Sequence, residues 1–454
     1  LTEYKNADEL TAEQKNRRTE ILTNLATNGI YVGGLPDVAE NAAVMAEVIE
    51  TAFSYQNSFE YAEMLAKMRV GVTNGTNIAD SVGTGITYQF VSQAVEKALE
   101  SPEDFVWSYI AVMFYNNQEQ HSLYLTADYS DDKRILAVVE NFEKQFEKQL
   151  GNDITKEERL GIKKLVMQTY LRALALDKCA DYGLEALKEF DNFFIRENTM
   201  YALLKTGRYD ECLMLANEVQ DDTNPVPLYY AAAATLESGE FDASAEYVLE
   251  LAKQVKTSEY PKKADELLHS YFSLLVVDTE TTKAKYGLLS DEQINKLNSD
   301  EFLKNYLAAY VNACYPSYGD HSIYDDAYTQ AMETALAAAD RVIAECGELC
   351  YPYYLKGVTL MQQKKYDEAV AAYKKAIDYK SDDPMIWYAL YAAYEELEEW
   401  ENAYTAAEIA IGLSPWFNYY SDYEGIGIHP YSYREGAKAM IEKQHEASQK
   451  GGNE

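Results

Sequence analysis

The sequence predicts an all-α fold, organised as a solenoid of antiparallel helix hairpins. Between Lys364 and Ile377 the apolar residues recur at i, i+3, i+4 and i+7, which is the spacing of one helix face. The same pattern returns 34 residues later, between Glu398 and Ile411. The chain of 454 residues has only 10 Pro and 22 Gly, while Ala, Leu, Glu and Lys are abundant, and this composition favours helices over a turn-rich β fold.

The N-terminal region, residues 1–155, is expected to be helical but diverged, because it shows no clear 34-residue period. Thr11 with Gln14 fits a capping box, in which each side chain satisfies a free amide at a helix entrance. We expect a short irregular or β element near Tyr109–Leu125. Apolar periodicity predicts helices at residues 37–68, 86–100 and 131–149.

Residues 156–349 are expected to form degenerate hairpins of the same kind, beginning with a helix at 157–178. The segments Thr206–Val219 and Ser238–Leu251 share a turn, an aromatic residue and a second-helix pattern, 32 residues apart. In these segments Cys212 and Ser244 take the place of a small alanine. Ser290 with Gln293 fits another capping box, and a last hairpin with a long connection is expected from Glu301–Cys314 and Asp326–Cys346.

The clearest repeat covers residues 350–415, where the agreement at 34-residue spacing extends over both helices of a hairpin. Gly357 takes a small position in the first copy, but the second copy has Tyr391 there. A closing proline, Pro415, ends the second copy only. The matching pairs are Tyr353 with Trp387, Tyr354 with Tyr388, Leu360 with Tyr394, Ala369 with Ala403, and Ala376 with Ala410.

On these residues the segment 350–415 resembles two tetratricopeptide repeats. The resemblance implies a right-handed α-α superhelix, in which small residues let paired helices approach and aromatic residues fill the gap to the next hairpin. After it, residues 416–454 are expected to hold an aromatic linker, a capping helix at about Ser432–Ala447 and a frayed tail.

The chain is strongly acidic, with 75 Asp and Glu against 40 Lys and Arg and a formal net charge of −35. A field of this sign repels phosphate backbones and anionic lipids, so nucleic-acid binding and electrostatic membrane adhesion are disfavoured. The acids form either a solvated surface or a surface for a basic partner.

The five cysteines are expected to be reduced core residues, because their odd number and wide spacing do not fit a disulfide framework. A pairing of Cys346 with Cys350, or a metal site there, is the alternative. No apolar run is long enough to cross a bilayer. Because the sequence starts at Leu1, a removed signal or anchor is one expectation and a cytoplasmic protein the other; the extracellular face of a bacterial membrane is favoured.

Catalytic and cofactor motifs are missing from the sequence, which has no phosphate-binding P-loop and no HExxH zinc pair. Asp128–Lys133 imitates half of a calcium loop, but it lacks the glycine and the final carboxylate. The segment Tyr315–Tyr328 is either a ligand loop or an extended connection held by its own aromatic residues. We therefore expect no enzyme, no metal and no cofactor, and only an unrecognised activity in residues 1–155 stays open.

The resemblance also implies where a ligand would bind, since the first helix of each tetratricopeptide hairpin lines a concave groove. Tyrosine, of which the chain has 40 against 4 Trp, offers broad contact area with a hydrogen-bonding tip at such a surface. The alternative is that these tyrosines only pack against neighbouring helices. The residues carried over to the groove are Tyr351, Tyr354, Met361, Met385, Tyr388, Glu395, Glu396, Tyr229 and Tyr201.

The predicted groove is aromatic and acidic, which departs from the family's carboxylate clamp of Lys, Asn and Arg. An acidic peptide terminus would be repelled there, whereas a protein or peptide segment with basic and apolar side chains would fit. The leading hypothesis is a non-enzymatic scaffold or adaptor that binds such a partner. The alternative is a bacterial cell-surface protein that binds a glycan or a small ligand.

Overall fold

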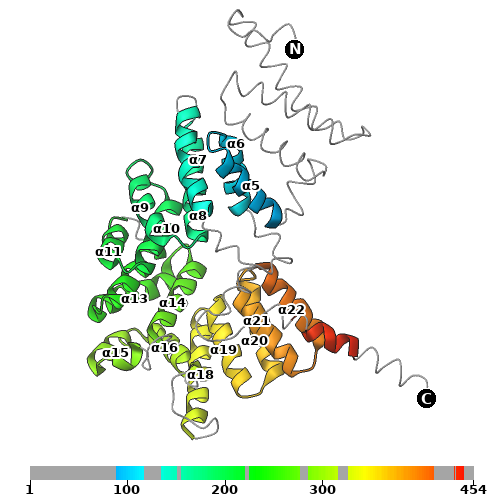
Figure 1. Cartoon of the computed structure of the whole chain (residues 1–454). Coiled ribbons are helices and arrows are strands. Elements are labelled where there is room, and N and C mark those ends of the chain that lie inside the picture. The colour runs from blue at the N-terminus through cyan, green and yellow to red at the C-terminus, as the bar shows by residue number, and fades with distance from the viewer. Residues whose placement is uncertain are drawn as a thin grey trace, which may run out of the picture. The chain divides into compact units, whose positions relative to one another are not determined.

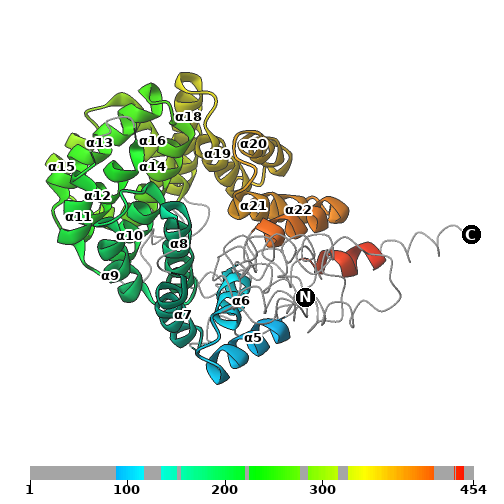
Figure 2. The same ribbon diagram turned by 90° about the horizontal axis from the view of Figure 1, so that it is seen from above.

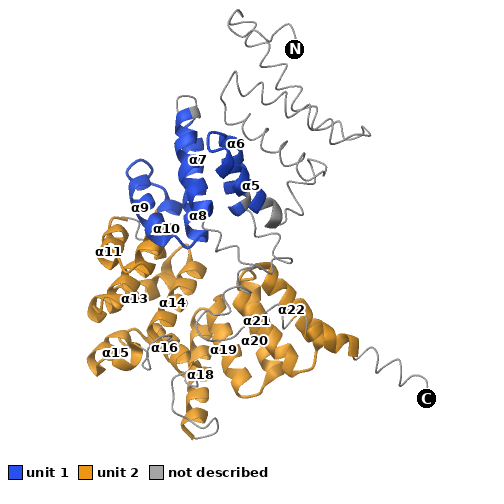
Figure 3. Cartoon of the chain, viewed as in Figure 1, with its two compact units in different colours: residues 1–195 blue, residues 196–454 orange. Residues whose placement is uncertain are grey.

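The computed structural model describes residues 88–116, 134–150, 155–219, 224–276, 285–314, 326–413, 434 and 436–443. All regular secondary structure within these ranges is helical, as the sequence predicts (Figure 1). The chain divides into two compact units, residues 1–195 and 196–454 (Figure 3). The expected helix at 37–68, the capping box at Thr11, the loop Asp128–Lys133 and the linker after residue 415 lie outside the described residues, as do positions 315–325 of the Tyr315–Tyr328 segment.

The first unit contains an aromatic core between two helices. Phe105 of α6 stacks on Phe142 of α7 with ring centroids 5.3 Å apart, and Tyr109 stacks on the same Phe142 at 6.1 Å. Tyr109 and the residues up to Asn116 are helical, so the expectation of an irregular or β element is wrong over this stretch. The described helices are α5 (Tyr88–Glu100), α6 (Phe105–Asn116), α7 (Arg134–Leu150), α8 (Lys156–Arg172), α9 (Leu176–Leu187) and the start of α10 (Phe193–Lys205).

The second unit is a run of helices in which most successive members pack against one another, as Figure 2 shows from above, whereas α15 packs on α13. Ser290 and Gln293 form the expected capping box at the start of α15. The elements after α10 are α11 (Tyr209–Asn217), α12 (Pro225–Glu237), α13 (Phe241–Thr257), α14 (Pro261–Val276), η5 (Lys285–Leu288), α15 (Asp291–Leu297), α16 (Glu301–Ala313), α18 (Asp326–Glu345), α19 (Cys350–Gln362), α20 (Tyr366–Tyr379), α21 (Pro384–Glu396) and α22 (Trp400–Leu413).

One tight turn recurs in five described hairpins, α8–α9, α10–α11, α12–α13, α19–α20 and α21–α22. In each, the residue two places before the second helix has a positive φ, a conformation that favours glycine. The next residue donates its N–H to a carbonyl five residues earlier, as from Lys365 to Leu360 and from Glu399 to Tyr394, both at 2.9 Å. The positive-φ residues are Leu174, Gly207, Gly239, Lys364 and Glu398.

A second recurrent feature is a small, fully buried residue at the fourth position of each second helix. In the three earlier hairpins this residue also bonds to the partner helix: the Cys212 thiol lies 3.5 Å from the Met200 carbonyl oxygen, and the Ser244 hydroxyl donates to Ala232 at 2.8 Å. Burial raises the pKa of Cys212 to about 12, so the thiol keeps its proton. The assignment of Cys212 and Ser244 to the small position is confirmed. The five residues are Cys179, Cys212, Ser244, Ala369 and Ala403, each 0% exposed.

In the two clear repeats, the small and the large residue between the paired helices have exchanged positions. A Cβ atom on Gly357 would lie 2.4 Å from the ring of Tyr373, so only glycine fits there. At the equivalent positions of the next repeat, 34 residues on, the large residue is Tyr391 and the small one is Ala407; both are buried. The exchange explains why tyrosine is tolerated at this small position.

Residues beyond α22 add one more layer to the second unit. Residues 436–443 are helical, within the helix expected at Ser432–Ala447. Ala437 is buried in the same apolar cluster as Tyr391, Ala403 and Ala407. Arg434 forms an ion pair with Glu408 of α22, with 3.5 Å between the charged atoms. Residues in this segment therefore contact the last clear repeat.

Candidate functional site

Helix α21 presents a stripe of partly exposed side chains, which we call the α21 stripe: Met385, Tyr388, Ala392, Glu395 and Glu396. Met385 is 38% exposed, and the half-buried Tyr388 ring stacks on Tyr391 with centroids 5.9 Å apart. The two carboxylates are exposed at the last turn of the helix. The spacing places all five on one helix face, which is apolar at its start and acidic at its end.

Local sequence explains where α21 begins. Asp383 is its N-cap, and its carboxylate accepts the N–H of Met385 at 2.9 Å. Pro384 follows at the first helical position, where its missing N–H is harmless. The predicted site residues of α21 are thus positioned by a cap that is readable in the sequence.

On α19, the first residues of the equivalent stripe are covered by other side chains of the same protein. Tyr351 is 6% exposed, its ring lies 4.1 Å from and parallel to the ring of His269, and its hydroxyl donates to Asp383 at 2.7 Å. Tyr354 is half-buried, with His269 edge-on at 5.8 Å and Tyr373 at 6.0 Å. A ligand contact of Tyr351 or Tyr354 stays a prediction.

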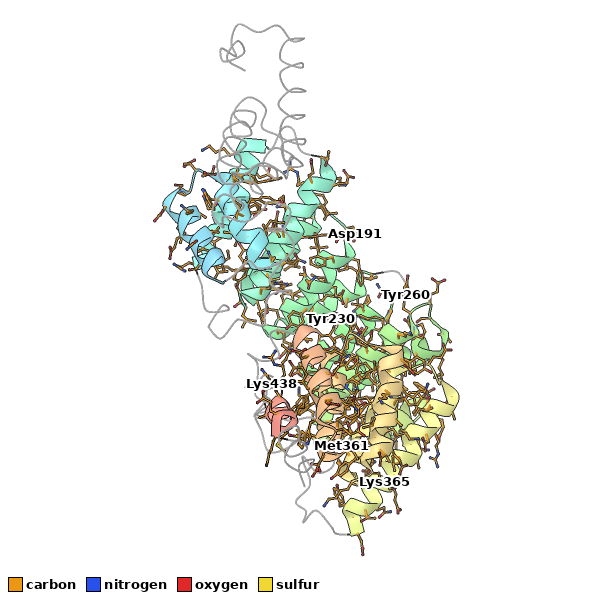
Figure 4. The ribbon with its side chains drawn as sticks, turned by 90° about the vertical axis from the view of Figure 1, so that its right-hand side faces the viewer. Asp191, Tyr230, Tyr260, Met361, Lys365 and Lys438 are labelled. Carbon is orange, nitrogen blue, oxygen red and sulfur yellow. The ribbon has the colours of Figure 1, made fainter. Side chains whose placement is uncertain are left out.

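Towards its C-terminal end α19 is more accessible. Val358 and Met361 are half-buried and pack on the cluster that contains Leu390 and Tyr391. Met361 and Lys365, labelled in Figure 4, lie on either side of the turn into α20. Met361 therefore joins α19 to the same apolar cluster that supports the α21 stripe.

Tyr201 and Tyr229 belong to earlier hairpins. Tyr201 is 39% exposed, and the ammonium group of Lys205 lies 6.0 Å from its ring centroid. Tyr229 is half-buried and packs edge-on against Tyr230, with centroids 5.1 Å apart. The nine predicted residues are therefore spread over the four helices α10, α12, α19 and α21.

A buried carboxylate that the sequence analysis did not select lies beneath α19. Asp265 of α14 is 0% exposed and accepts the N–H groups of Cys350 and Tyr351 at 2.9 and 3.1 Å. Its other oxygen accepts the hydroxyl of Tyr306. Leu349, the N-cap residue of α19, offers no side-chain acceptor, so α19 is capped by a residue 85 positions away in the sequence.

Burial governs the charge of this region. Desolvation raises the pKa of Asp265 to about 6, although the hydrogen bonds from Tyr306, Tyr351 and Cys350 oppose the rise. Burial also lowers the pKa of His269 to about 3, so its imidazole is neutral at neutral pH. The Nδ1 atom of His269 is buried and has no hydrogen-bond partner among the described residues.

One feature of the sequence indicates that Asp265 is a buried carboxylate. The residue falls on the apolar stripe of α14, in register with Leu268, Phe272 and Leu275, where a carboxylate is out of place. An acid at such a position indicates a specific buried partner. The partner itself could not be read, because no local pattern connects Asp265 to Cys350.

In the described ranges, no three His, Cys, Asp or Glu side chains come together in a way that could hold a metal ion. No helix among the described residues is both long enough and apolar enough to span a membrane.

Residues 357–397 match the family model for the TPR repeat. No curated protein sequence matches the chain. The TPR2AB domain of yeast Sti1, in complex with pHSP90, is 14% identical over 62% of this chain and 99% of that chain, with a TM-score of 0.24.

Yeast Tom70 is 11% identical over 95% of this chain and 97% of that chain, with a TM-score of 0.28. MamA from AMB-1 is 14% identical over 48% of this chain and 96% of that chain, with a TM-score of 0.23. The matched segment 357–397 runs from the middle of α19 into the turn between α21 and α22, where the 34-residue period and the recurrent turn coincide. Residues 357–397 therefore carry the tetratricopeptide repeat pattern.

Proposed function

We propose that the protein is a non-enzymatic scaffold or adaptor that binds a protein or peptide on its concave face, which the first helices of its repeats line. The α21 stripe is the observation that carries the proposal. It combines an exposed methionine and a half-exposed tyrosine with two carboxylates on one helix face. Apolar anchors beside a charged end are what an amphipathic partner segment needs.

The charge of the stripe supports a partner with basic and apolar side chains. The hairpin α21–α22, residues 384–413, contains six Glu and no Lys or Arg. Glu395 and Glu396 also lie at the C-terminal end of α21, where the helix dipole adds negative potential. Lysine or arginine side chains would be attracted there, and an acidic peptide would be repelled.

The test is a peptide array that contains basic–apolar, acidic–apolar and neutral sequences of equal length, followed by calorimetric titration of the peptides that bind. We expect basic–apolar peptides to bind. The double variant Met385→Ala/Tyr388→Ala should weaken their binding about tenfold or more, because apolar anchors dominate such interfaces. Unchanged helical circular dichroism would show that the loss is local.

Two matched controls are available in the second unit. Met214 on α11 is 56% exposed, so Met214→Ala removes an exposed methionine outside the stripe. Glu333 on α18 is exposed, so Glu333→Gln is the control for Glu395→Gln/Glu396→Gln. The proposal would be contradicted if the stripe variants and the control variants lost the same amount of peptide affinity. It would also be contradicted if no peptide on the peptide array bound while sugars on a glycan array did.

A further inference from the structure

Helix α14 holds the start of the first clear repeat through one carboxylate. Both N–H groups at the beginning of α19 that point to Asp265 bond to a single oxygen, Oδ2. The second oxygen receives the Tyr306 hydroxyl from α16. Three donors thus converge on a fully buried group. The two adjacent amides tie the start of α19 to α14, and the Tyr306 hydroxyl ties α16 to α14.

The second clear repeat is connected to the same point through Tyr351. The amide of Tyr351 donates to Asp265, while its hydroxyl donates to Asp383 Oδ2 at 2.7 Å. Asp383 in turn caps α21 through the N–H of Met385. The N-termini of α19 and α21 are therefore linked in series to Asp265, with Tyr351 as the connecting residue.

Two neighbours of Asp265 on α14 strengthen this connection. His269, one helical turn further on, stacks its ring on the ring of Tyr351 at 4.1 Å. Glu266 forms an ion pair at 3.2 Å with Lys380, which lies in the connection between α20 and α21. Helix α14 thus contacts the beginning of α19 through a stacked ring and the link to α21 through an ion pair.

The position of this network in the array is significant. The recurrent turn joins the hairpins up to α13 and again from α19 onward, whereas the intervening residues between α14 and α18 show no residue of positive φ in their described part. The recurrent turn therefore does not join α19–α22 to α13; the hairpin α16–α18 lies between them in the chain and packs on α19. Hydrogen bonds have a narrow range of good distances and angles, so the Asp265 network selects one arrangement.

We propose that Asp265 is a positioning residue that holds the α19–α22 repeat pair on α14 and passes this restraint through Tyr351 to the N-terminus of α21. Its effect on ligand affinity rests on the proposed function of the α21 stripe, but its effect on the helix N-termini does not. The carboxylate acts only as an acceptor of hydrogen bonds. An amide of the same shape can keep its oxygen on the two N–H groups and turn its NH2 to the Tyr306 oxygen.

Amide hydrogen exchange on the full chain tests the proposal. In Asp265→Ala, exchange at Cys350, Tyr351 and Met385 should accelerate at least tenfold, whereas Asp265→Asn should stay within about threefold of the parent protein. The N–H of Val226 is the internal reference, because Asn224 caps α12 locally at 3.0 Å and makes no contact with the network. Unchanged exchange at Cys350 and Tyr351 in Asp265→Ala would overturn the proposal.

A milder variant tests the serial connection if Asp265→Ala does not fold. Tyr351→Phe keeps the ring and the amide but removes the bond to Asp383. We expect faster exchange at Met385 and unchanged exchange at Cys350. Acceleration at neither position would show that Tyr351 does not transmit the restraint.

The binding measurement separates this proposal from the proposed function. Asp265→Ala should lower the affinity of an array-selected basic–apolar peptide several-fold, and Asp265→Asn should restore it. If no peptide binds the parent protein, the proposed function fails, and the exchange experiment still decides the role of Asp265. If peptides bind with equal affinity to the parent and Asp265→Ala while exchange at Cys350 and Tyr351 accelerates, the positioning role does not extend to the stripe.

Discussion

The two clear repeats, α19–α20 and α21–α22, have the same backbone and opposite surfaces. Their turns carry φ values of 59° at Lys364 and 57° at Glu398, and the same closing hydrogen bond. Residues 350–379 contain five Lys against three Asp and Glu, whereas residues 384–413 contain six Glu and no Lys or Arg. The comparison shows that the repeat fold constrains the turn and the buried positions but leaves the charge of the surface free to vary.

The buried positions of the two repeats differ too, but in a compensated way. Gly357 faces Tyr373 in the first, and Tyr391 occurs with Ala407 in the second. One large and one small residue fill the space between the paired helices in both cases. The fold therefore requires one large and one small residue at these two positions together. A repeat consensus that treats each position separately describes this requirement incompletely.

The largest expected effect comes from breaking this compensation in the first repeat. Gly357→Tyr alone should lower the free energy of unfolding by about 3 kcal/mol or more, because even a Cβ atom would overlap the Tyr373 ring. Adding Tyr373→Ala should restore at least half of the loss, since it reproduces the pair of the second repeat. Chemical denaturation of the parent protein and the two variants measures both values. A double variant no more stable than Gly357→Tyr would contradict pairwise compensation.

The caps of the two first helices should differ in their contribution. Asp265→Ala removes a buried acceptor from two N–H groups and a tyrosine hydroxyl, and we expect a loss of about 3 kcal/mol. Asp383→Ala removes a local, partly exposed cap and should cost about 1 kcal/mol. Denaturation at neutral pH measures both. Equal losses of unfolding free energy in the two variants would show that the remote cap stabilises the protein no more than the local one.

The remote cap should also make stability depend on pH. The folded-state pKa of Asp265, about 6, lies above its ordinary value of 3.8, so the folded chain binds the proton more tightly than the unfolded chain. The resulting stabilisation is complete below pH 3.8 and is lost as the pH rises through 6.

Asp265→Asn does not titrate and provides the reference. The free energy of unfolding of the parent protein, relative to this variant, should fall by about 2 kcal/mol between pH 4 and pH 7. Denaturation curves of both proteins across this range give the difference. A constant difference, or one that grows with pH, would contradict a raised pKa.

The smallest effects are expected at the shared turn. Lys364→Gly and Glu398→Gly should each stabilise the chain by about 0.5–1 kcal/mol, because both residues have the positive φ that glycine adopts without strain. Gly239→Ala, in the equivalent turn before α13, should destabilise by a similar amount. Thermal unfolding of the three variants checks the signs. Opposite signs at Lys364 and Glu398 would mean that the two turns are not equivalent.

Local patterns predicted much of this molecule correctly. The 34-residue period located both clear hairpins, and the small residues Cys212 and Ser244 marked two degenerate ones. The stretch around Tyr109 was misread because α6 is apolar on all sides and so shows no helical periodicity. The positive φ at Lys364 and Glu398 also left no trace, since neither residue is a glycine.

In the candidate site, too, some features follow from residues close in sequence and others depend on distant residues. The α21 stripe and its Asp383 cap follow from residues close in sequence, because a helix brings positions three and four apart to one face. The burial of Tyr351, by contrast, depends on His269 and Asp265, which precede it by more than 80 residues. Periodicity reports which face of a helix is buried but carries no information about which distant helix covers it. Only the folded chain decided that α14 holds the start of α19 while the face of α21 stays exposed.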